Sequence, residues 1–235
     1  MFKLFNKKTD NKSSVNNELF LLDDNSRFDI KEAYNELRTN IIFSIPKKDC
    51  KVICITSSMA SEGKSTVSVN NAVTFAKSGK KILLIDCDLR KPNVANILKM
   101  KNKKGLSEVL VETESAQNVI NKNVFENLDV MFAGSIPPNP VELISSDNME
   151  KLINNLKKDY DYIFIDTPPI NVVTDAAIVS RLTDGVIMVA RQNVAEKKLF
   201  TEAINKLEFA KVKIIGVVLN GVDNFKEEYY KYSYK

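Results

Sequence analysis

The sequence predicts a doubly wound α/β fold, in which a mostly parallel sheet is flanked by helices on both faces. Short segments such as residues 82–85 and 163–165 are apolar at every position, which is typical of strands that helices cover on both sides. These segments alternate with longer stretches of helical periodicity, and this alternation is the element order of a doubly wound sheet. Ligands of such sheets bind at the carboxyl ends of the strands.

Local patterns predict each element and the domain organisation. The expected strands are residues 52–56, 81–86, 128–132, 162–166, 186–190 and 214–219. The expected helices are residues 29–43, 64–77, 106–111, 149–157, 175–181 and 196–209. With no internal repeat, the chain is expected to form one domain at residues 27–224, preceded by a mobile polar arm at 1–26 and followed by a tail at 225–235.

The composition excludes several classes of protein. Hydrophobic residues make up 44% of the chain and charged residues 27%, as in an ordinary globular protein. The net charge of +4 is small and dispersed, so we do not expect nucleic-acid binding. The sequence has no apolar run of about 18 residues, and its first residues lack the apolar run of a signal peptide, so we expect neither a membrane span nor a secretory leader. Its three cysteines have no paired spacing, which favours a reduced, cytoplasmic compartment. The absence of histidine excludes His-based triads and most zinc sites.

A phosphate-binding loop is predicted between the first expected core strand and the helix that follows it. Small residues after the strand lead into Gly63-Lys64-Ser65-Thr66, where backbone N–H groups and the helix dipole favour phosphate. Lys64 can reach the β- and γ-phosphates, and Ser65 offers a hydroxyl to Mg²⁺. Ser58 stands where the usual pattern has its first glycine. The alternative interpretation of so short a motif is an ordinary helix start with a solvated lysine. With this loop, the predicted fold is like that of P-loop NTPases.

Aspartates follow two other expected strands. Asp86 and Asp88 lie two residues apart at the end of one strand, and Asp166 lies at the end of another. A single aspartate there could merely cap a turn, but two such sites beside a Gly-Lys-Ser-Thr loop indicate a common role. Their oxygens can hold Mg²⁺, directly or through water, and one can accept a proton from an attacking hydroxyl.

Two further segments carry polar groups in a regular arrangement. On the expected helix at residues 29–43, Glu32, Asn35 and Arg38 lie three residues apart on one side, and a solvated helix face would explain them equally. The last seven residues contain four tyrosines, which are Tyr229, Tyr230, Tyr232 and Tyr234. Exposed hydroxyls on a mobile tail indicate a phosphorylation substrate; the alternative is an end that pairs as an edge strand or packs on a neighbour.

Together these residues resemble the bacterial tyrosine kinases (BY-kinases) of capsule and exopolysaccharide synthesis. The chain is most similar to the stand-alone cytoplasmic type of Firmicutes, whose membrane-spanning activator is a separate polypeptide. The likeness runs from Glu32 to the C-terminus. It covers the loop at 57–66, the Walker A′ segment at 82–92, the Walker B segment at 163–169 and the Gly-Ser-Ile-Pro-Pro-Asn-Pro segment that begins at 134. The D-x-D-x-R sequence and the tyrosine tail are its specific features.

The resemblance implies an ATP- and Mg²⁺-dependent protein-tyrosine kinase with Lys64, Asp86, Asp88 and Asp166 as catalytic residues. The implied nucleotide-binding residues are Ala60, Ser61, Glu62, Gly63, Lys64, Ser65, Thr66 and Asn220. Ser65, Asp88 and Asp166 would hold Mg²⁺, Thr66 the α-phosphate, and Asn220 the adenine, while Asp86 would act as base toward tyrosine. The tail tyrosines would be the phosphoacceptors, modified between subunits.

The resemblance also implies partners and a location. Glu32 and Arg38 match the ends of an E-x-x-R-x-x-R oligomerisation motif, so a ring-shaped homo-oligomer is expected, bound to the inner face of the membrane through its activator. Asn35 replaces the middle arginine of that motif, which makes a ring held by this helix less secure. Ala60-Ser61 replaces the Pro-Gly of many members, which is expected to alter the flexibility of the loop.

Two rival functions share the predicted fold. Partition and cell-division ATPases carry a second lysine five residues before the loop lysine, where this chain has Met59, and they lack a tyrosine tail. A catalytically idle nucleotide-binding scaffold is the other rival, and the presence of all the catalytic carboxylates argues against it.

Overall fold

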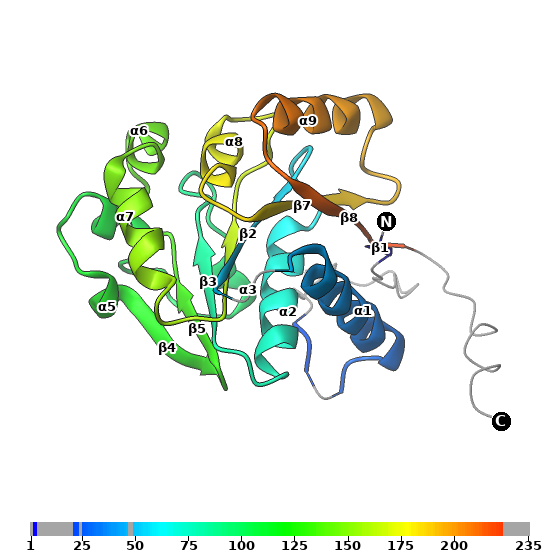
Figure 1. Ribbon diagram of the computed structural model, residues 1–235, viewed down its shortest axis with the longest axis horizontal. Coiled ribbons are helices and arrows are strands. Elements are labelled where there is room, and N and C mark those ends of the chain that lie inside the picture. Colours follow the sequence, from blue (N-terminus) through cyan, green and yellow to red (C-terminus); the bar gives the residue numbers. More distant parts are fainter. Residues whose placement is uncertain (1, 4–20, 24, 47–48, 223–235) are drawn as a thin grey trace, which may run out of the picture.

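A single mixed sheet organises the molecule. The computed structural model describes residues 2–3, 21–23, 25–46 and 49–222, and the rest of the chain is drawn as a grey trace in Figure 1. Its strands are β1 (Phe2–Lys3), β2 (Lys51–Ser57), β3 (Ile82–Asp86), β4 (Ile120–Phe125), β5 (Leu128–Met131), β6 (Tyr162–Asp166), β7 (Gly185–Arg191) and β8 (Ile214–Asn220). The order of these eight strands across the sheet is β1-β8-β7-β2-β6-β3-β5-β4, and only the β4–β5 pair is antiparallel.

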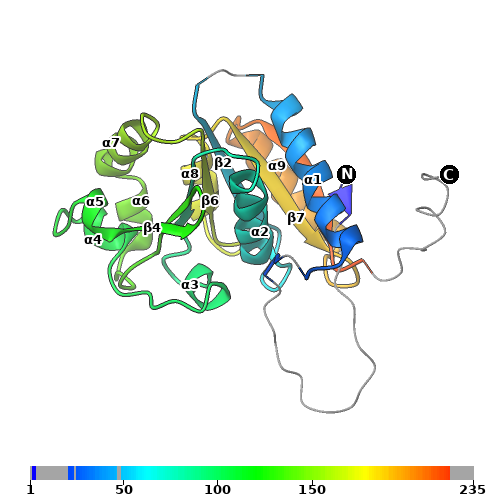
Figure 2. The same ribbon diagram turned by 90° about the horizontal axis from the view of Figure 1, so that it is seen from below.

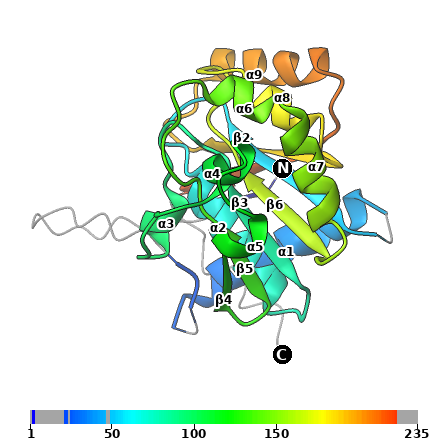
Figure 3. The same ribbon diagram turned by 90° about the vertical axis from the view of Figure 1, so that its left-hand side faces the viewer.

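Helices cover both faces of this sheet. They are α1 (Phe28–Ser44), α2 (Lys64–Ala76), α3 (Val94–Ile97), α4 (Leu106–Leu110), α5 (Ala116–Val119), α6 (Pro140–Ile144), α7 (Asp147–Leu156), α8 (Asp175–Ser180) and α9 (Lys197–Phe209). α1 and α2 lie on one face and α8 and α9 on the other, as Figures 1 and 2 show from two directions and Figure 3 shows from the β4 edge. Among the described residues, no helix combines the length and the apolar character needed to cross a bilayer.

The side chains of the central strands alternate between the two layers. On β2, Ile53 and Ile55 pack in the cluster formed with α1, α2 and α3, whereas Val52 packs against α4 to α7. Cys54 packs in a third cluster with α8 and α9. All four residues are fully buried. Burial on both faces explains why these strands are continuous apolar runs.

The strand order brings the predicted site residues together. β6 lies between β2 and β3, and Asp166 at its end is in register with Ile55 on one side and Asp86 on the other. The Thr56 hydroxyl donates to the Pro168 carbonyl at 2.8 Å, which ties the end of β2 to the segment after β6. The loop before α2 and both aspartate segments therefore meet at the carboxyl edge of the sheet.

The sequence-based fold prediction is confirmed, with five short elements missed. Every expected strand and helix is present within about two residues of its expected bounds. The missed elements are β1, β4, α3, α5 and α6, none longer than six residues. β4 has a mixed pattern of buried and exposed positions and pairs with β5 through a turn in which Asn127 adopts a φ of +63°. Such elements are too short to show a hydrophobic period.

The core reaches into the segment expected to be an arm. Leu22 is buried in the α1–α2 layer, and its backbone N–H donates to Oδ1 of Asn70 at 2.8 Å. Residues 21–23 therefore contact the folded domain. The domain boundaries at 27 and 224 stay predictions.

Candidate active site

The loop between β2 and α2 is closed by its own side chains. The Ser58 hydroxyl donates to Oε1 of Glu62 at 2.6 Å, and the Ser58 N–H donates to Oε2 at 2.9 Å. Gly63 precedes α2 with a φ of +91°, and Ser61 has a φ of +67°, a region that favours glycine. Ala60 and Ser61 lie exposed at the loop tip, whereas Glu62 is buried. The loop is thus a fixed structure even with a serine in place of its first glycine.

Two residues from neighbouring strands hold the loop from outside. The Asn220 amide at the end of β8 donates to the Glu62 carbonyl at 3.0 Å, and Arg191 donates to the Ser61 carbonyl at 3.4 Å. A Cβ on Gly63 would lie 2.0 Å from the Asn220 amide nitrogen, so this contact requires glycine. The structure therefore places Asn220 against the loop backbone, and its predicted contact with adenine stays a prediction.

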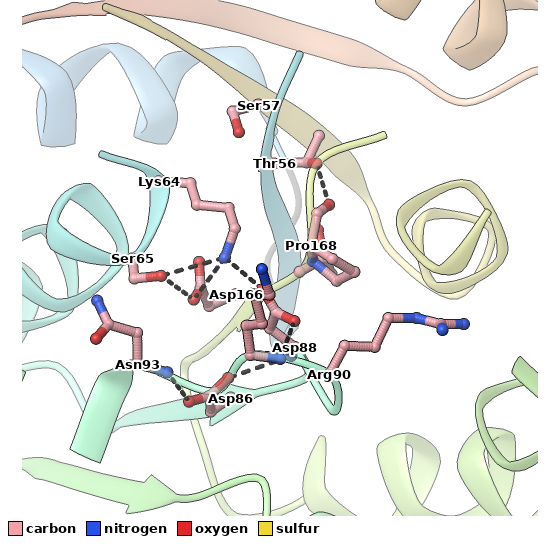
Figure 4. A network of polar contacts seen from close by, with 12 residues as sticks. Thr56, Ser57, Lys64, Ser65, Asp86, Asp88, Arg90, Asn93, Asp166 and Pro168 are labelled. Carbon is pink, nitrogen blue, oxygen red and sulfur yellow. Dashed lines mark hydrogen bonds and ion pairs between the residues drawn. The ribbon is translucent and has the colours of Figure 1, made fainter. Parts of the chain in front are cut away.

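Lys64 links the loop to both aspartate segments. Its Nζ lies 3.0 Å from Asp88 Oδ2 and 3.5 Å from Asp166 Oδ2, and Figure 4 shows the amino group between the two carboxylates. The Ser65 hydroxyl donates to the same Asp166 oxygen at 2.6 Å. Four of the predicted residues, from three separate segments, are therefore in direct contact.

Ser68 also belongs to this cluster, and the sequence analysis missed it. Its hydroxyl donates to Oδ1 of Asp166 at 3.0 Å. Ser68 lies three residues after Ser65 on α2, so both hydroxyls lie on one side of the helix. That spacing is the signal that could have identified it.

Asp86 has a structural task at the end of β3. Its Oδ2 accepts the backbone N–H groups of Asn93 and Val94 at 3.2 and 3.0 Å, and its Oδ1 accepts that of Asp88 at 3.2 Å. Asp86 is fully buried. These contacts close the segment 86–94 into a compact turn that carries Asp88.

Burial and like charges shift the protonation of this cluster. Burial, followed by the charge of Asp166, raises the pKa of Asp86 to about 7. Burial also raises the pKa of Asp166, although Lys64 and the Ser65 hydrogen bond oppose the shift. Burial acts to lower the pKa of Lys64, but the charges of Asp166 and Asp88 outweigh it and raise the pKa. Lys64 is therefore charged at neutral pH.

The donors at this edge suit a magnesium ion. Asp86, Asp88 and Asp166 supply up to three negative charges, whereas Lys64 is the one cation that forms an ion pair with Asp88 and Asp166 among the described residues. Excess negative charge and hard oxygen donors fit Mg²⁺. In the described part of the chain, no three His, Cys, Asp or Glu side chains form a closed metal cage. Mg²⁺ typically binds one or two carboxylates together with waters and substrate phosphates, so the open arrangement fits a nucleotide-associated ion.

Other predicted residues lie away from this cluster. On α1, Glu32 accepts from the Asn35 amide at 2.9 Å, and Arg38 donates to the Thr74 carbonyl of α2 at 3.3 Å. Thr66 is half-buried in the first turn of α2. The tail tyrosines 229, 230, 232 and 234 lie outside the described residues. A groove of about 850 Å³ between α8 and α9, lined by residues such as Val172 and Phe209, includes none of the predicted site residues.

Comparison with known proteins identifies the family. The AAA domain family AAA_31 matches residues 50–213. The tyrosine-protein kinase YwqD of Bacillus subtilis is 40% identical over 201 residues, which are 86% of this chain and 85% of that protein. The putative tyrosine-protein kinase CapB of Staphylococcus aureus is 38% identical over 211 residues, 90% of this chain and 92% of CapB. The chain belongs to the bacterial tyrosine-protein kinases.

Solved structures place this tyrosine-protein kinase in the same group. The chimerical protein CapA2B2 has a TM-score of 0.85 at 34% identity, covering 95% of this chain and 94% of that one. The kinase domain of the Escherichia coli tyrosine kinase ETK has a TM-score of 0.80 at 35% identity, covering 87% and 80%. The septum site-determining protein MinD of Pyrococcus horikoshii, complexed with Mg-ADP, is more distant at a TM-score of 0.63 and 26% identity, covering 73% and 70%. The resemblance inferred from sequence is confirmed, and the cell-division ATPases are the more remote relatives.

Proposed function

We propose that this kinase uses ATP and Mg²⁺ to phosphorylate tyrosines of its own C-terminal tail. The observation that carries the proposal is the contact of Lys64 with both Asp88 and Asp166, in a chain whose relatives are named tyrosine-protein kinases. Phosphoryl transfer requires positioning and charge stabilisation more than covalent chemistry from the protein. A phosphate-binding loop that meets acidic side chains supplies both.

Each nucleotide-binding residue has a task set by its position. The backbone of the loop from Ala60 to Gly63 and the first turn of α2 face the phosphates, Lys64 contacts the β- and γ-phosphates, and Thr66 contacts the α-phosphate. Asn220 lies beside the loop and contacts the adenine. On nucleotide binding, Lys64 exchanges its ion pairs with Asp88 and Asp166 for phosphate oxygens.

Three oxygen donors would hold the metal ion. Ser65, Asp88 and Asp166 would be the ligands, some of them through water. When bound, Mg²⁺ would supply positive charge against the charge that develops on the phosphate oxygens. The hydroxyl of Ser68, which donates to Asp166, keeps that carboxylate oriented.

Asp86 serves as the base. A free tyrosine has a pKa of about 10, so its proton must leave as the new bond forms. The phenol oxygen bonds to the γ-phosphorus, the bond from that phosphorus to the β–γ bridging oxygen breaks, and ADP leaves, while the phenolic proton passes to Asp86. The raised pKa of Asp86, about 7, suits a base that works near neutral pH.

The acceptors are Tyr229, Tyr230, Tyr232 and Tyr234, and transfer occurs between neighbouring subunits of a homo-oligomer. Glu32 and Arg38 contribute to that interface, in a ring that forms at the inner face of the membrane through a membrane-spanning activator. A relative solved as a chimerical protein, CapA2B2, fits a kinase that acts with a second polypeptide. The cycle of phosphorylation regulates capsular or exopolysaccharide synthesis.

Peptide mass spectrometry tests the proposal. The chain is incubated with ATP and Mg²⁺, with and without a cytoplasmic fragment of the activator, beside a Lys64→Met control. We expect phosphate on the tail tyrosines of the unmodified chain and none on the control. ATP hydrolysis without phosphotyrosine, even with the activator fragment, would favour a switch ATPase like the more distant MinD proteins.

A further inference from the structure

Arg90, the arginine of the D-x-D-x-R segment, pairs with a buried carboxylate on another element. Its Nε lies 3.0 Å from Asp175 Oδ2, and its Nη2 lies 3.3 Å from Oδ1, so both carboxylate oxygens are engaged. Asp175 is the first residue of α8 and is fully buried, whereas the Arg90 side chain is 37% exposed. In Figure 4 the guanidinium group points away from Lys64 and Asp166. Arg90 is thus placed to hold a structure rather than to contact phosphate.

The segment that Arg90 holds is the one that carries Asp88. It begins where the Cys87 N–H donates to the Asp166 carbonyl at 2.8 Å, and it ends where Asp86 accepts the backbone N–H groups of Asn93 and Val94. Between these two anchors, the Asp88 carboxylate accepts the Lys91 N–H at 3.0 Å through Oδ1 and contacts Lys64 through Oδ2. The Arg90 pair is a third anchor, two residues beyond Asp88.

The two-point contact between Arg90 and Asp175 is suited to fixing the geometry of the Asp88 segment. A two-point pair between a guanidinium and a carboxylate fixes orientation as well as distance, which a lysine cannot reproduce. Asp175 cannot turn toward water because it is fully buried. The contact therefore holds Arg90, and with it the Asp88 segment, in a fixed position relative to α8. This helix packs against β2 on the opposite layer from α2.

We propose that Arg90 and Asp175 form a positioning pair that fixes the position of the Asp88 carboxylate. Through that position the pair determines the affinity of the site for Mg²⁺ and nucleotide. The inference rests on the proposed function, because it takes Asp88 as a magnesium ligand. Groups that orient metal ligands without touching the metal alter metal affinity by about 10- to 100-fold when they are removed. Loss of the pair should therefore weaken the effect of Mg²⁺ on nucleotide binding while the nucleotide still binds.

Calorimetric titration with ADP, with and without Mg²⁺, measures this effect without any catalytic step. The unmodified chain should bind ADP more tightly with Mg²⁺, and we expect that gain to fall about 10-fold in Arg90→Gln. Arg90→Lys should retain only part of the gain, because lysine keeps the charge but not the two-point contact. Lys91→Gln is the matched control, since it removes an exposed charge from the same segment and should behave as the unmodified chain.

The double variant Arg90→Gln/Asp175→Asn separates positioning from stability. Arg90→Gln alone leaves a buried carboxylate without its cation and should lower the melting temperature. Adding Asp175→Asn removes that charge, so the melting temperature should recover in part while the Mg²⁺ gain stays low. Recovery of both would overturn the inference, as would an undiminished gain in Arg90→Gln. A complete lack of Mg²⁺ effect in the unmodified chain would instead overturn the proposed metal site, and the inference with it.

Discussion

The hydroxyl of Ser58 donates a 2.6 Å hydrogen bond to Oε1 of Glu62, across the turn of the phosphate-binding loop. The backbone N–H of Ser58 donates to the other oxygen of the same carboxylate at 2.9 Å, and Glu62 is buried. In the usual loop pattern a glycine precedes this turn. Here Ser58 takes the place of that glycine, and its hydroxyl adds a hydrogen bond to Glu62 that closes the loop.

Replacing Ser58 by alanine should destabilise the nucleotide-free chain by about 2 kcal/mol. The variant loses a hydrogen bond to a charged, buried carboxylate, and such bonds contribute about 1.5–3 kcal/mol. Urea denaturation measures the free energy of unfolding. Ser145→Ala is the control, because that exposed hydroxyl donates to a carbonyl within a helix and its loss should cost under about 0.5 kcal/mol. Equal losses in the two variants would contradict this role of Ser58.

Replacing Ser61 by glycine should stabilise the chain by about 0.5 kcal/mol. The φ of +67° costs a side-chain-bearing residue about 1–2 kcal/mol, and glycine removes this strain. Glycine also loses more conformational freedom on folding, which offsets part of the stabilisation. The hydrogen bond from Arg191 reaches the Ser61 carbonyl, so it survives the change. The same substitution at Ser145, where φ is −84°, should destabilise. Both thermal and urea unfolding should show that Ser61→Gly stabilises the chain and that Ser145→Gly destabilises it.

Gly134 and Gly79 share a φ of +81° but differ in the space around them. A Cβ on Gly79 would meet nothing within 4 Å, whereas one on Gly134 would lie 2.0 Å from Glu108 Oε2 and 2.8 Å from the Gly105 nitrogen. Glu108 accepts the Gly105 N–H at 2.7 Å and the Ser135 N–H at 3.1 Å, so it cannot withdraw without cost.

Gly79→Ala should therefore cost about 1 kcal/mol, from backbone strain alone. Gly134→Ala should cost about 3 kcal/mol, because the Glu108 hydrogen bonds are lost as well. Measuring the free energy of unfolding of both variants tests whether Gly134→Ala costs more than Gly79→Ala. Similar losses would mean that the Glu108 contacts add little to the segment that starts at Gly134.

The raised pKa of Asp86 makes stability depend on pH. Because the folded chain binds this proton more tightly than the unfolded chain, the free energy of unfolding should fall as pH rises from about 4 to about 7. Asp86→Asn should flatten this fall by up to about 1.4 kcal/mol per pH unit, although the variant is less stable throughout because Asp86 caps backbone N–H groups.

Urea denaturation at pH 5, 6 and 7 in the presence of a chelator measures that slope. Asp129→Asn is the control. Its pKa is lowered in the folded chain, despite burial, by hydrogen bonds from Lys122 and Tyr160, so its contribution changes below about pH 4 and not in this range. A slope that Asp86→Asn leaves unchanged would show that Asp86 is ionised in the folded chain across this range.

Local patterns in the sequence were sufficient to predict most strands and helices. Strands such as β2 and β6 are continuous apolar runs, and α2 begins at the Gly-Lys-Ser-Thr motif, so each follows from residues close together in the chain. The same local patterns placed Lys64, Asp86 and Asp166 at element ends, where a doubly wound sheet binds ligands. The family was inferred from a resemblance, whose specific features are the D-x-D-x-R sequence and the tyrosine tail.

Which of these groups come into contact depends on how the strands and helices pack. The position of β6 between β2 and β3 sets Asp166 beside Asp86, and no local pattern encodes strand order. The pairing of Arg90 with Asp175 joins residues 85 positions apart, and Asn220 holds a loop 158 positions away. Such contacts depend on the packing of whole layers, since the cost of burying a charge or an amide depends on the partner that the fold brings to it.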